Sequence, residues 1–352
     1  MGGGIVGLAL GVEALLLAGM TLLLLSVASR RSLRRRRLAP RIANGRAAVR
    51  DHLAGHVLPE AQRAELQALP TAIRIRLVAG PGAALSGDGR ARLTALADDL
   101  GLLAWAERRC ASRRWWRRLR GVRLFTLVGG GDGAVPALLS DANREVRAGA
   151  ATWSADHPDP RSIGRLLDLL GDSEPLVRFM AKNALLRIGR ASVGPLAARL
   201  SVVSGRELEG ALEVAIGLAE SRLSAPALAL VSADSARVRS LAATLTAAGG
   251  GARAVAAVEG LLDDPAPAVR AAAVEGLGSL AHWPAGPAIA GALRDPAWEV
   301  RRQAALALRA LGAPGIVLLR RALVDQDRYA RDMARQVLDL PGARRRRLET
   351  SA

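Results

Sequence analysis

Six arginines stand at a regular spacing in the C-terminal part of the sequence, each shortly after an aspartate. The phrase "DDPAPAVRAAA", for example, contains Asp264 and Arg270. A carboxylate and a guanidinium can join through two parallel charge-assisted hydrogen bonds. Each arginine falls where a helix should begin, although the partial positive charge of a helix N-terminus disfavours a cation. The recurrence therefore indicates a repeated use for the pair. The pairs are Asp141 and Arg147, Asp172 and Arg178, Asp234 and Arg239, Asp264 and Arg270, Asp295 and Arg301, and Asp325 and Arg331.

Residues typical of catalysis or metal binding form no convincing group in the sequence. His52 and His56 could share a helix face, but no third ligand stands nearby, so we interpret them as surface histidines. The single cysteine, Cys110, excludes an intramolecular disulfide framework and a cysteine-based zinc site. The stretch "VGGGDG" at 128–133 lacks the Lys-Ser/Thr pair of a phosphate loop. We therefore predict no enzymatic activity, no metal, no cofactor and no small-molecule ligand.

The spacing of the arginines defines an internal repeat. Adjacent arginines lie 30 or 31 residues apart, except that a gap of 61 separates Arg178 from Arg239. Glu209 stands where an arginine is due inside that gap. After each arginine position, apolar residues recur at steps of four and three, which places them on one helix face. The pattern predicts about seven repeats of helix, aspartate-bearing turn and helix, which must stack because neither helix buries both faces alone.

This pattern resembles HEAT repeats of the short bacterial, PBS-lyase type. The resemblance covers residues 134–340 and extends weakly over 41–130. It implies an all-α fold in which HEAT-like helix pairs build a right-handed α-solenoid. It also implies a ladder, in which the aspartate of one repeat pairs with the arginine of a neighbour and offsets the helix dipole. Because Glu209 breaks the rule, we expect the ladder to be interrupted in the third repeat, which would permit a bend or a local partner site.

The N-terminal residues 1–29 predict a single transmembrane anchor. The sequence from Gly3 to Ser29 is apolar except for Glu13, which is long enough for a helix to cross a ~30 Å hydrocarbon core. Arginines follow this run and none precedes it. The positive-inside tendency then predicts a single-pass protein of the cell membrane, with its N-terminus outside and the repeats in the cytoplasm.

Further residues of this region have expected membrane roles. Gly3, Gly7 and Gly11 share one helix face and predict packing against a second membrane helix. Glu13 would face a partner helix, be protonated, or lie high enough to reach water. The basic juxtamembrane segment at 30–50 is expected to contact anionic lipid. Its lipid-contacting residues are Arg30, Arg31, Arg34, Arg35, Arg36 and Arg37.

The formal charge of +18 is concentrated outside the repeats. Residues 141–340 hold 24 basic and 22 acidic side chains, so that region is nearly neutral. Nucleic-acid binding needs a basic surface and is therefore not the favoured function of the repeats. Half of the excess lies at 30–50, which hold nine arginines and no acid, and the rest lies in the irregular helical lead-in or cap at 51–130 and in the basic tail at 341–352. Within the lead-in, Trp115 and Trp116 among arginines could stack on RNA, lie at a membrane surface, or pack in a cap helix.

The function that these features favour is a membrane-tethered scaffold or adaptor, with about seven repeats over 131–340 that bind a protein partner. Such a partner could itself be a membrane-associated enzyme. HEAT-like proteins display a concave face lined by the second helix of each pair, and exposed Trp and Arg often anchor interfaces. A nucleic-acid-binding HEAT-like protein and a bilin lyase-like protein are the alternatives. The candidate partner-binding residues are Lys182, Arg187, Trp298, Arg302 and Arg309.

Overall fold

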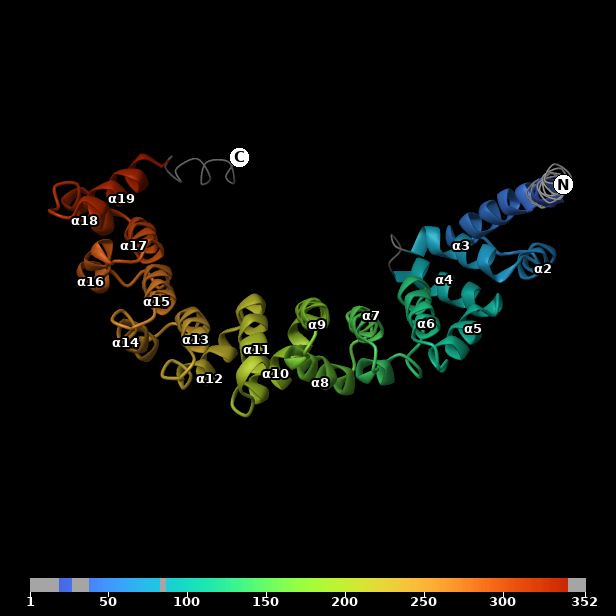
Figure 1. Cartoon of the computed structure of the whole chain (residues 1–352), viewed down its shortest axis with the longest axis horizontal. Coiled ribbons are helices and arrows are strands. Elements are labelled where there is room, and N and C mark those ends of the chain that lie inside the picture. Colours follow the sequence, from blue (N-terminus) through green and yellow to red (C-terminus); the bar gives the residue numbers. More distant parts are fainter. Residues whose placement is uncertain (1–18, 27–37, 83–86, 341–352) are drawn as a thin grey trace, which may run out of the picture. The chain divides into compact units, whose positions relative to one another are not determined.

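The regular secondary structure of the described residues is entirely helical. This structure is a computed structural model, and it describes residues 19–26, 38–82 and 87–340. The chain divides into two compact units, unit 1 over Met1–Ala134 and unit 2 over Val135–Ala352. Every regular element of the described residues is a helix, as Figure 1 shows.

Most of the predicted membrane anchor lies outside the described residues. This holds for Gly3, Gly7, Gly11 and Glu13, for the arginines at 30–37, and for the tail at 341–352. Residues 19–26 are helical, and their leucines are 59–68% exposed. In the described part of the chain, no helix combines the length and the apolar character needed to cross a membrane.

Unit 1 is a group of short helices around a leucine-rich core. A helix over 38–53 is followed by α2 (Glu60–Gln67), α3 (Thr71–Gly82), α4 (Gly87–Asp99), α5 (Leu102–Cys110) and α6 (Trp115–Val128). The helices α5 and α6 pack closely, because Gly121 has no side chain: a Cβ there would lie 2.7 Å from the Cys110 sulfur. Burial, reinforced by the charge of Glu107, raises the pKa of the Cys110 thiol to about 11.

Unit 2 consists of stacked helix pairs. In Figure 1 the longer, second helices lie side by side along the inner side of this unit's curve, and the shorter, first helices lie along its outer side. The second helices are α7 (Arg144–Ser154), α9 (Pro175–Ile188), α11 (Gly205–Leu218), α13 (Ala236–Gly249), α15 (Pro267–Ser279), α17 (Trp298–Ala310) and α19 (Arg328–Asp339). The first helices are the 3-10 turn Pro136–Ser140, α8 (Pro160–Asp168), α10 (Val193–Leu200), α12 (Ser224–Leu228), α14 (Ala252–Glu259), α16 (Gly286–Gly291) and α18 (Ala313–Ala322).

The apolar stripe of each second helix forms the core of unit 2. In α15, Val269, Ala273 and Leu277 are fully buried, at the steps of four that the sequence predicts. Small residues set how closely neighbouring helices approach. A Cβ at Gly278 of α15 would lie only 2.7 Å from the Ala307 Cβ of α17, and a Cβ at Gly276 only 2.9 Å from the Ala247 Cβ of α13.

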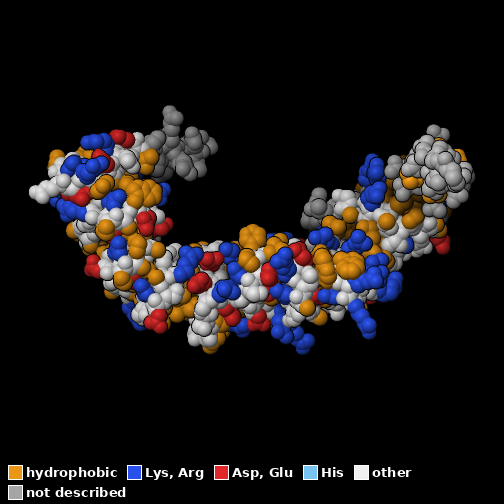
Figure 2. Space-filling model, viewed as in Figure 1, with side chains coloured by type: hydrophobic (Ala, Val, Ile, Leu, Met, Phe, Trp, Pro, Cys, Tyr) orange, Lys and Arg blue, Asp and Glu red, His pale blue; other side chains and the backbone are white. Residues whose placement is uncertain are grey.

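The beginnings of these helices follow from local sequence. Proline occupies the first turn of α9 and α15, where its missing N–H has no partner to lose. The side chains of Asn143 and Ser235 instead accept hydrogen bonds from the first-turn N–H groups of α7 and α13. Figure 2 shows acidic and basic side chains interspersed over the visible face of unit 2, in keeping with its near-neutral composition.

Candidate functional site

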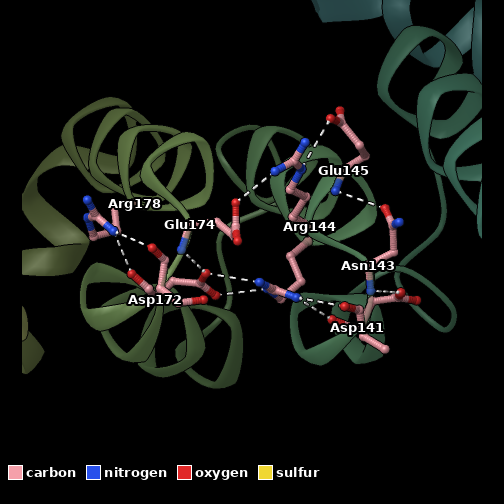
Figure 3. Close-up of polar contacts among 10 residues, drawn as sticks. Asp141, Asn143, Arg144, Glu145, Asp172, Glu174 and Arg178 are labelled. Atoms are coloured by element: carbon pink, nitrogen blue, oxygen red, sulfur yellow. Dashed lines mark hydrogen bonds and ion pairs between the residues drawn. The ribbon is translucent and has the colours of Figure 1, made fainter.

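Three arginines of the repeat pattern bind the aspartate of the next repeat. The Nε and Nη2 atoms of Arg147 donate to the two carboxylate oxygens of Asp172, at 2.8 and 2.9 Å (Figure 3). Arg239 binds Asp264 and Arg270 binds Asp295 in the same two-bond arrangement, at 2.7 and 2.9 Å. Each pair spans 25 residues. We call each such pair a closed rung.

The remaining nitrogen of each guanidinium is bound within its own turn. Arg147 Nη1 donates to the carbonyl oxygens of Asp141 and Ala142, at 2.8 and 3.2 Å. The rung aspartate likewise accepts a hydrogen bond from the backbone N–H two residues later, at 2.9 Å for Asp172 and 2.8 Å for Asp264 and Asp295. A closed rung therefore fastens two successive turns together, and its carboxylate offsets the repulsion between the arginine and the helix dipole.

The side chains of the closed rungs are shielded from solvent, so water and salt weaken the attraction between their charges less than at the surface. Their side chains are 6–15% exposed. Hydrogen bonds from Arg239 hold the pKa of Asp264 below its ordinary value of 3.8. At Asp295, burial acts to raise the pKa, but the bonds from Arg270 and from a backbone N–H outweigh it and lower the pKa overall. Both aspartates are therefore held in the ionised form.

The ladder expected from the repeats is interrupted twice, and the first interruption is wider than expected. From Arg178 the 25-residue step that defines a rung reaches Val203, which has no carboxylate. From Glu209 the same step reaches Asp234, so that both members of the pair are acidic. Asp234 is exposed, and it precedes Arg239 by five residues rather than six. The prediction that Asp234 and Arg178 each close a rung is therefore wrong, because Glu209 stands where Asp234 needs an arginine and Val203 stands where Arg178 needs an aspartate.

The second interruption surrounds Arg301, for which the predicted rung with Asp325 is also wrong. Asp325 instead accepts two hydrogen bonds from Arg294, at 3.0 and 2.6 Å. The aromatic ring of Tyr329 covers the Arg301 guanidinium, 4.7 Å from its central carbon, and Arg301 is only 9% exposed. Arg301 and Asp325 lie 24 residues apart, one fewer than the 25-residue step of a closed rung, so the aspartate is out of register with this arginine.

The last predicted arginine, Arg331, binds the carbonyl oxygens of Asp325 and Gln326 in its own turn. Arg178 has the same anchoring, from Nη1 to the carbonyl oxygens of Asp172 and Ser173 at 2.8 and 3.0 Å. Figure 3 shows Arg178 held in this way, beside the closed rung at Asp172. Neither arginine forms an ion pair with a carboxylate among the described residues.

A groove of about 350 Å³ lies between α9 and α11, at the first interruption. Its charged lining includes Arg178, Lys182, Arg206, Glu209 and Glu213. Phe179 also lines the groove and is 54% exposed. In Figure 2, apolar side chains gather next to charged ones over this part of the inner face. The groove thus combines an apolar surface with several cations.

One carboxylate in the groove is already neutralised by neighbours from two other helices. Glu213 of α11 pairs with Lys182 of α9 at 3.0 Å and with Arg237 of α13 at 2.7 Å. Burial acts to raise the pKa of Glu213, but the hydrogen bonds and charges of both cations lower it overall. This network bridges three successive second helices on the inner face.

The five predicted partner-binding residues have different environments. Lys182 lies in the groove, paired with Glu213, whereas Arg187 pairs with Asp156 at 2.5 Å. Arg309 donates to the carbonyl oxygens of Val337 and Leu340 at the end of α19. These contacts give Arg187 and Arg309 partners within the chain.

Trp298 and Arg302 lie together near the start of α17. The guanidinium of Arg302 lies 6.0 Å from the Trp298 ring, which is 58% exposed. The structure thus presents these two residues on one surface. Sequence reasoning missed Arg178, Phe179 and Arg206 as a group, although the gap of 61 residues in the arginine spacing pointed to this place.

The other residues singled out in the sequence lie in unit 1. Trp115 and Trp116 are 40% and 43% exposed, their rings 6.2 Å apart, and Arg114 lies over the Trp116 ring. The ring Nδ1 atoms of His52 and His56 each lie within hydrogen-bonding distance of a backbone carbonyl. Among the described residues no group of three or more His, Cys, Asp or Glu is arranged to hold a metal ion.

Comparison with known proteins identifies the repeats. Residues 132–217 and 254–339 match the family model of HEAT repeats, and unit 2 is an all-α HEAT-repeat solenoid. The residues between the two matched segments include α12 and α13. No curated protein matches the sequence.

Several solved structures are similar to parts of this chain at low sequence identity and with TM-scores below 0.5. A chain from the complex of Kap95p with RanGDP matches with a TM-score of 0.49 and 14% identity, over 83% of this chain and 50% of that one. The CpcE–CpcF complex of phycocyanin lyase from Nostoc matches with a TM-score of 0.38 and 18% identity, over 59% and 93%. Human deoxyhypusine hydroxylase matches with a TM-score of 0.29 and 21% identity, over 67% and 94%.

Proposed function

We propose that the protein is a scaffold that binds a protein partner on the inner face of unit 2. HEAT repeats are generally protein-binding scaffolds. The observation that carries the proposal is the groove between α9 and α11, where a built-in rung is missing and an exposed aromatic ring lies beside several cations. Aromatic residues and arginine are enriched where proteins bind one another.

The exposed apolar residues of α9 support this choice of face. Leu176 and Phe179 are 39% and 54% exposed, although both lie in the first turns of a helix whose opposite face is fully buried. Burying such side chains against a partner would be favourable by roughly 25 cal/mol per Å² of apolar surface. The neighbouring cations would give the contact its direction and specificity.

Site-specific photo-crosslinking in cells tests the inner face. A photoreactive phenylalanine analogue replaces Phe179 on α9 or, as a matched control on an outer helix, Val317 on α18, which is 48% exposed. We expect a discrete crosslinked species from position 179 and none from position 317. Crosslinks from 317 alone would contradict the proposal.

The proposal includes attachment of the scaffold to a membrane through residues 1–29. Its support is the apolar run from Gly3 to Ser29, the arginines that follow it, and the exposed leucines of the helical stretch 19–26. From the positive-inside tendency we propose that the repeats lie in the cytoplasm. We expect the full chain to stay in the membrane pellet after alkaline carbonate extraction and a variant lacking residues 1–29 to be released; release of the full chain would contradict the tether.

A further inference from the structure

We infer that Arg178 is a receptor for a carboxylate of the partner protein, which takes the place of the aspartate that the next repeat lacks. This inference rests on the proposed function, because it assigns the partner chemistry of the same groove. The ligand class is an acidic segment, with an aspartate or glutamate side chain seated on the guanidinium and an apolar residue beside it.

The closed rungs show what an arginine at this position binds. In Arg147, Arg239 and Arg270 the Nη1 atom donates to two carbonyl oxygens of its own turn, and the Nε and Nη2 atoms donate to a carboxylate. The carboxylate is bound through two hydrogen bonds of 2.7–2.9 Å in all three cases. The site is therefore specific for a planar anion with two oxygens.

Arg178 forms the bonds to its own turn, but the next repeat has no aspartate at the rung position. Its Nη1 atom is anchored to the carbonyl oxygens of Asp172 and Ser173, so its guanidinium is oriented in advance. The residue that would supply the carboxylate is Val203. Preorganisation of this kind lowers the entropic cost of binding a ligand.

A partner can reach Arg178, in contrast to the arginine at the other interruption. Arg178 lines the groove between α9 and α11, whereas Arg301 is 9% exposed beneath Tyr329. The absence of a closed rung thus leaves a covered arginine in one place and an arginine at a groove in the other.

The charges around the groove favour an acidic ligand. The cations that line it are Arg178, Lys182 and Arg206, and the anions are Glu209 and Glu213. Because Glu213 is already paired with Lys182 and with Arg237, Glu209 is the one lining carboxylate without an ion pair among the described residues. An incoming carboxylate thus meets the two cations Arg178 and Arg206 against the single charge of Glu209, and Phe179 offers an adjoining apolar contact.

A peptide taken from the protein's own closed rung provides the probe. A fluorescein-labelled peptide of residues 292–300, "ALRDPAWEV", carries the turn of Asp295 that Arg270 binds, and a second peptide has Asn in place of Asp. Fluorescence anisotropy with the full-length protein in detergent measures both dissociation constants. We expect the Asp peptide to bind about fivefold or more tightly than the Asn peptide, a typical margin for a charged hydrogen-bonded pair.

Two variants test the role of Arg178. In Val203→Asp the chain itself supplies a carboxylate at the rung position, so we expect the Asp peptide to bind about fivefold or more weakly. Val202→Asp is the matched control, because it adds the same charge one residue away on a side chain that is 76% exposed, and it should leave binding within about twofold. Arg178→Lys keeps the charge but lacks the two-pronged geometry, so it should remove the preference for Asp over Asn.

Equal binding of the two peptides, or equal effects of Val203→Asp and Val202→Asp, would overturn the inference. If Val203→Asp fails to give the circular dichroism spectrum of the parent, the loss of Asp preference in Arg178→Lys decides the question alone. The proposed function fails separately: crosslinks from position 179 without Asp preference would leave the inner face as the partner surface and remove only its carboxylate specificity.

Discussion

The stretch from α13 to α17 and the stretch from α9 to α11 are built from the same repeat but use it differently. In the first, Arg239 and Arg270 bind the aspartates of the following repeats, and glycines bring the helices close together. In the second, Val203 and Glu209 replace the aspartate and the arginine of the pattern, and a groove lies where a rung would be. The comparison teaches that the arginine which would fasten α9 to the next repeat instead lines a groove, where we infer that it recognises a carboxylate.

The largest expected effect comes from opening a closed rung. Asp295→Ala leaves the Arg270 guanidinium without its carboxylate and a turn N–H without its acceptor, so we expect the free energy of unfolding to fall by roughly 2–4 kcal/mol. Urea unfolding followed by circular dichroism measures the change. The control Asp234→Ala removes an exposed, out-of-register aspartate and should change stability by about 0.5 kcal/mol or less. Similar losses in both variants would mean that the closed rungs do not fasten the repeats.

A smaller loss of stability is expected at the second interruption, where the ring of Tyr329 covers the Arg301 guanidinium. Tyr329→Ala removes the ring that lies over Arg301, and we expect a loss of about 1–2 kcal/mol in the same urea assay. Trp298→Ala removes a ring of similar exposure that covers no buried cation and should cost about 0.5 kcal/mol. If the two variants lose equally, Tyr329 is not what shields Arg301.

A carboxylate restored at position 203, in the first interruption, should stabilise the folded chain. We expect Val203→Asp to raise the free energy of unfolding by about 1 kcal/mol, because it completes a charge-assisted rung with Arg178. Val202→Asp should leave the urea midpoint nearly unchanged. A loss of stability in Val203→Asp alone would show that the two repeats do not share the geometry of the closed rungs.

The smallest effect is a dependence on pH. The pKa values of Asp264 and Asp295 are lower in the folded chain than their ordinary value of 3.8, so the folded state favours their ionised form. Their contribution to stability is therefore complete above about pH 4 and is lost as the pH falls through the folded values. We expect the urea midpoint to fall between pH 5 and pH 3, and to fall less in a variant carrying both Asp264→Asn and Asp295→Asn. An equal fall in both proteins would assign the acid sensitivity to other carboxylates.

Much of unit 2 could be predicted from the sequence, because its repeats leave a signal at one fixed spacing. The helices of α15 and α17 follow from buried residues such as Val269 and Ala304, which recur at steps of four and three, and the family of the repeats follows from the same pattern. The repeat spacing alone did not predict which rungs are closed, because a closed rung requires an arginine and an aspartate 25 residues apart. A single residue separates Asp325 from the position that would close a rung with Arg301, whereas the step back from Asp234 leads to Glu209 in place of an arginine.

Glu209 and the gap of 61 residues indicated the place of the groove, but the residues that line it could not be predicted. Val203 carries no signal for a site, and Arg178 looks the same in the sequence as the arginines of the closed rungs. Lys182 and Arg187 looked equally available, yet one lies in the groove and the other pairs with Asp156, a distinction set by packing between neighbouring repeats.

Nuclear magnetic resonance of the arginine Nε–H groups can observe carboxylate recognition at Arg178 itself. In ¹⁵N-labelled full-length protein, the Arg178 resonance is assigned by its disappearance in Arg178→Lys, and the Arg270 resonance by the same substitution there. On addition of the Asp295-containing peptide, the Arg178 resonance should shift while that of Arg270, already engaged by Asp295, stays in place. An Arg178 resonance that does not move, or that moves equally with the Asn peptide, would contradict the assignment of this arginine as the partner's carboxylate receptor.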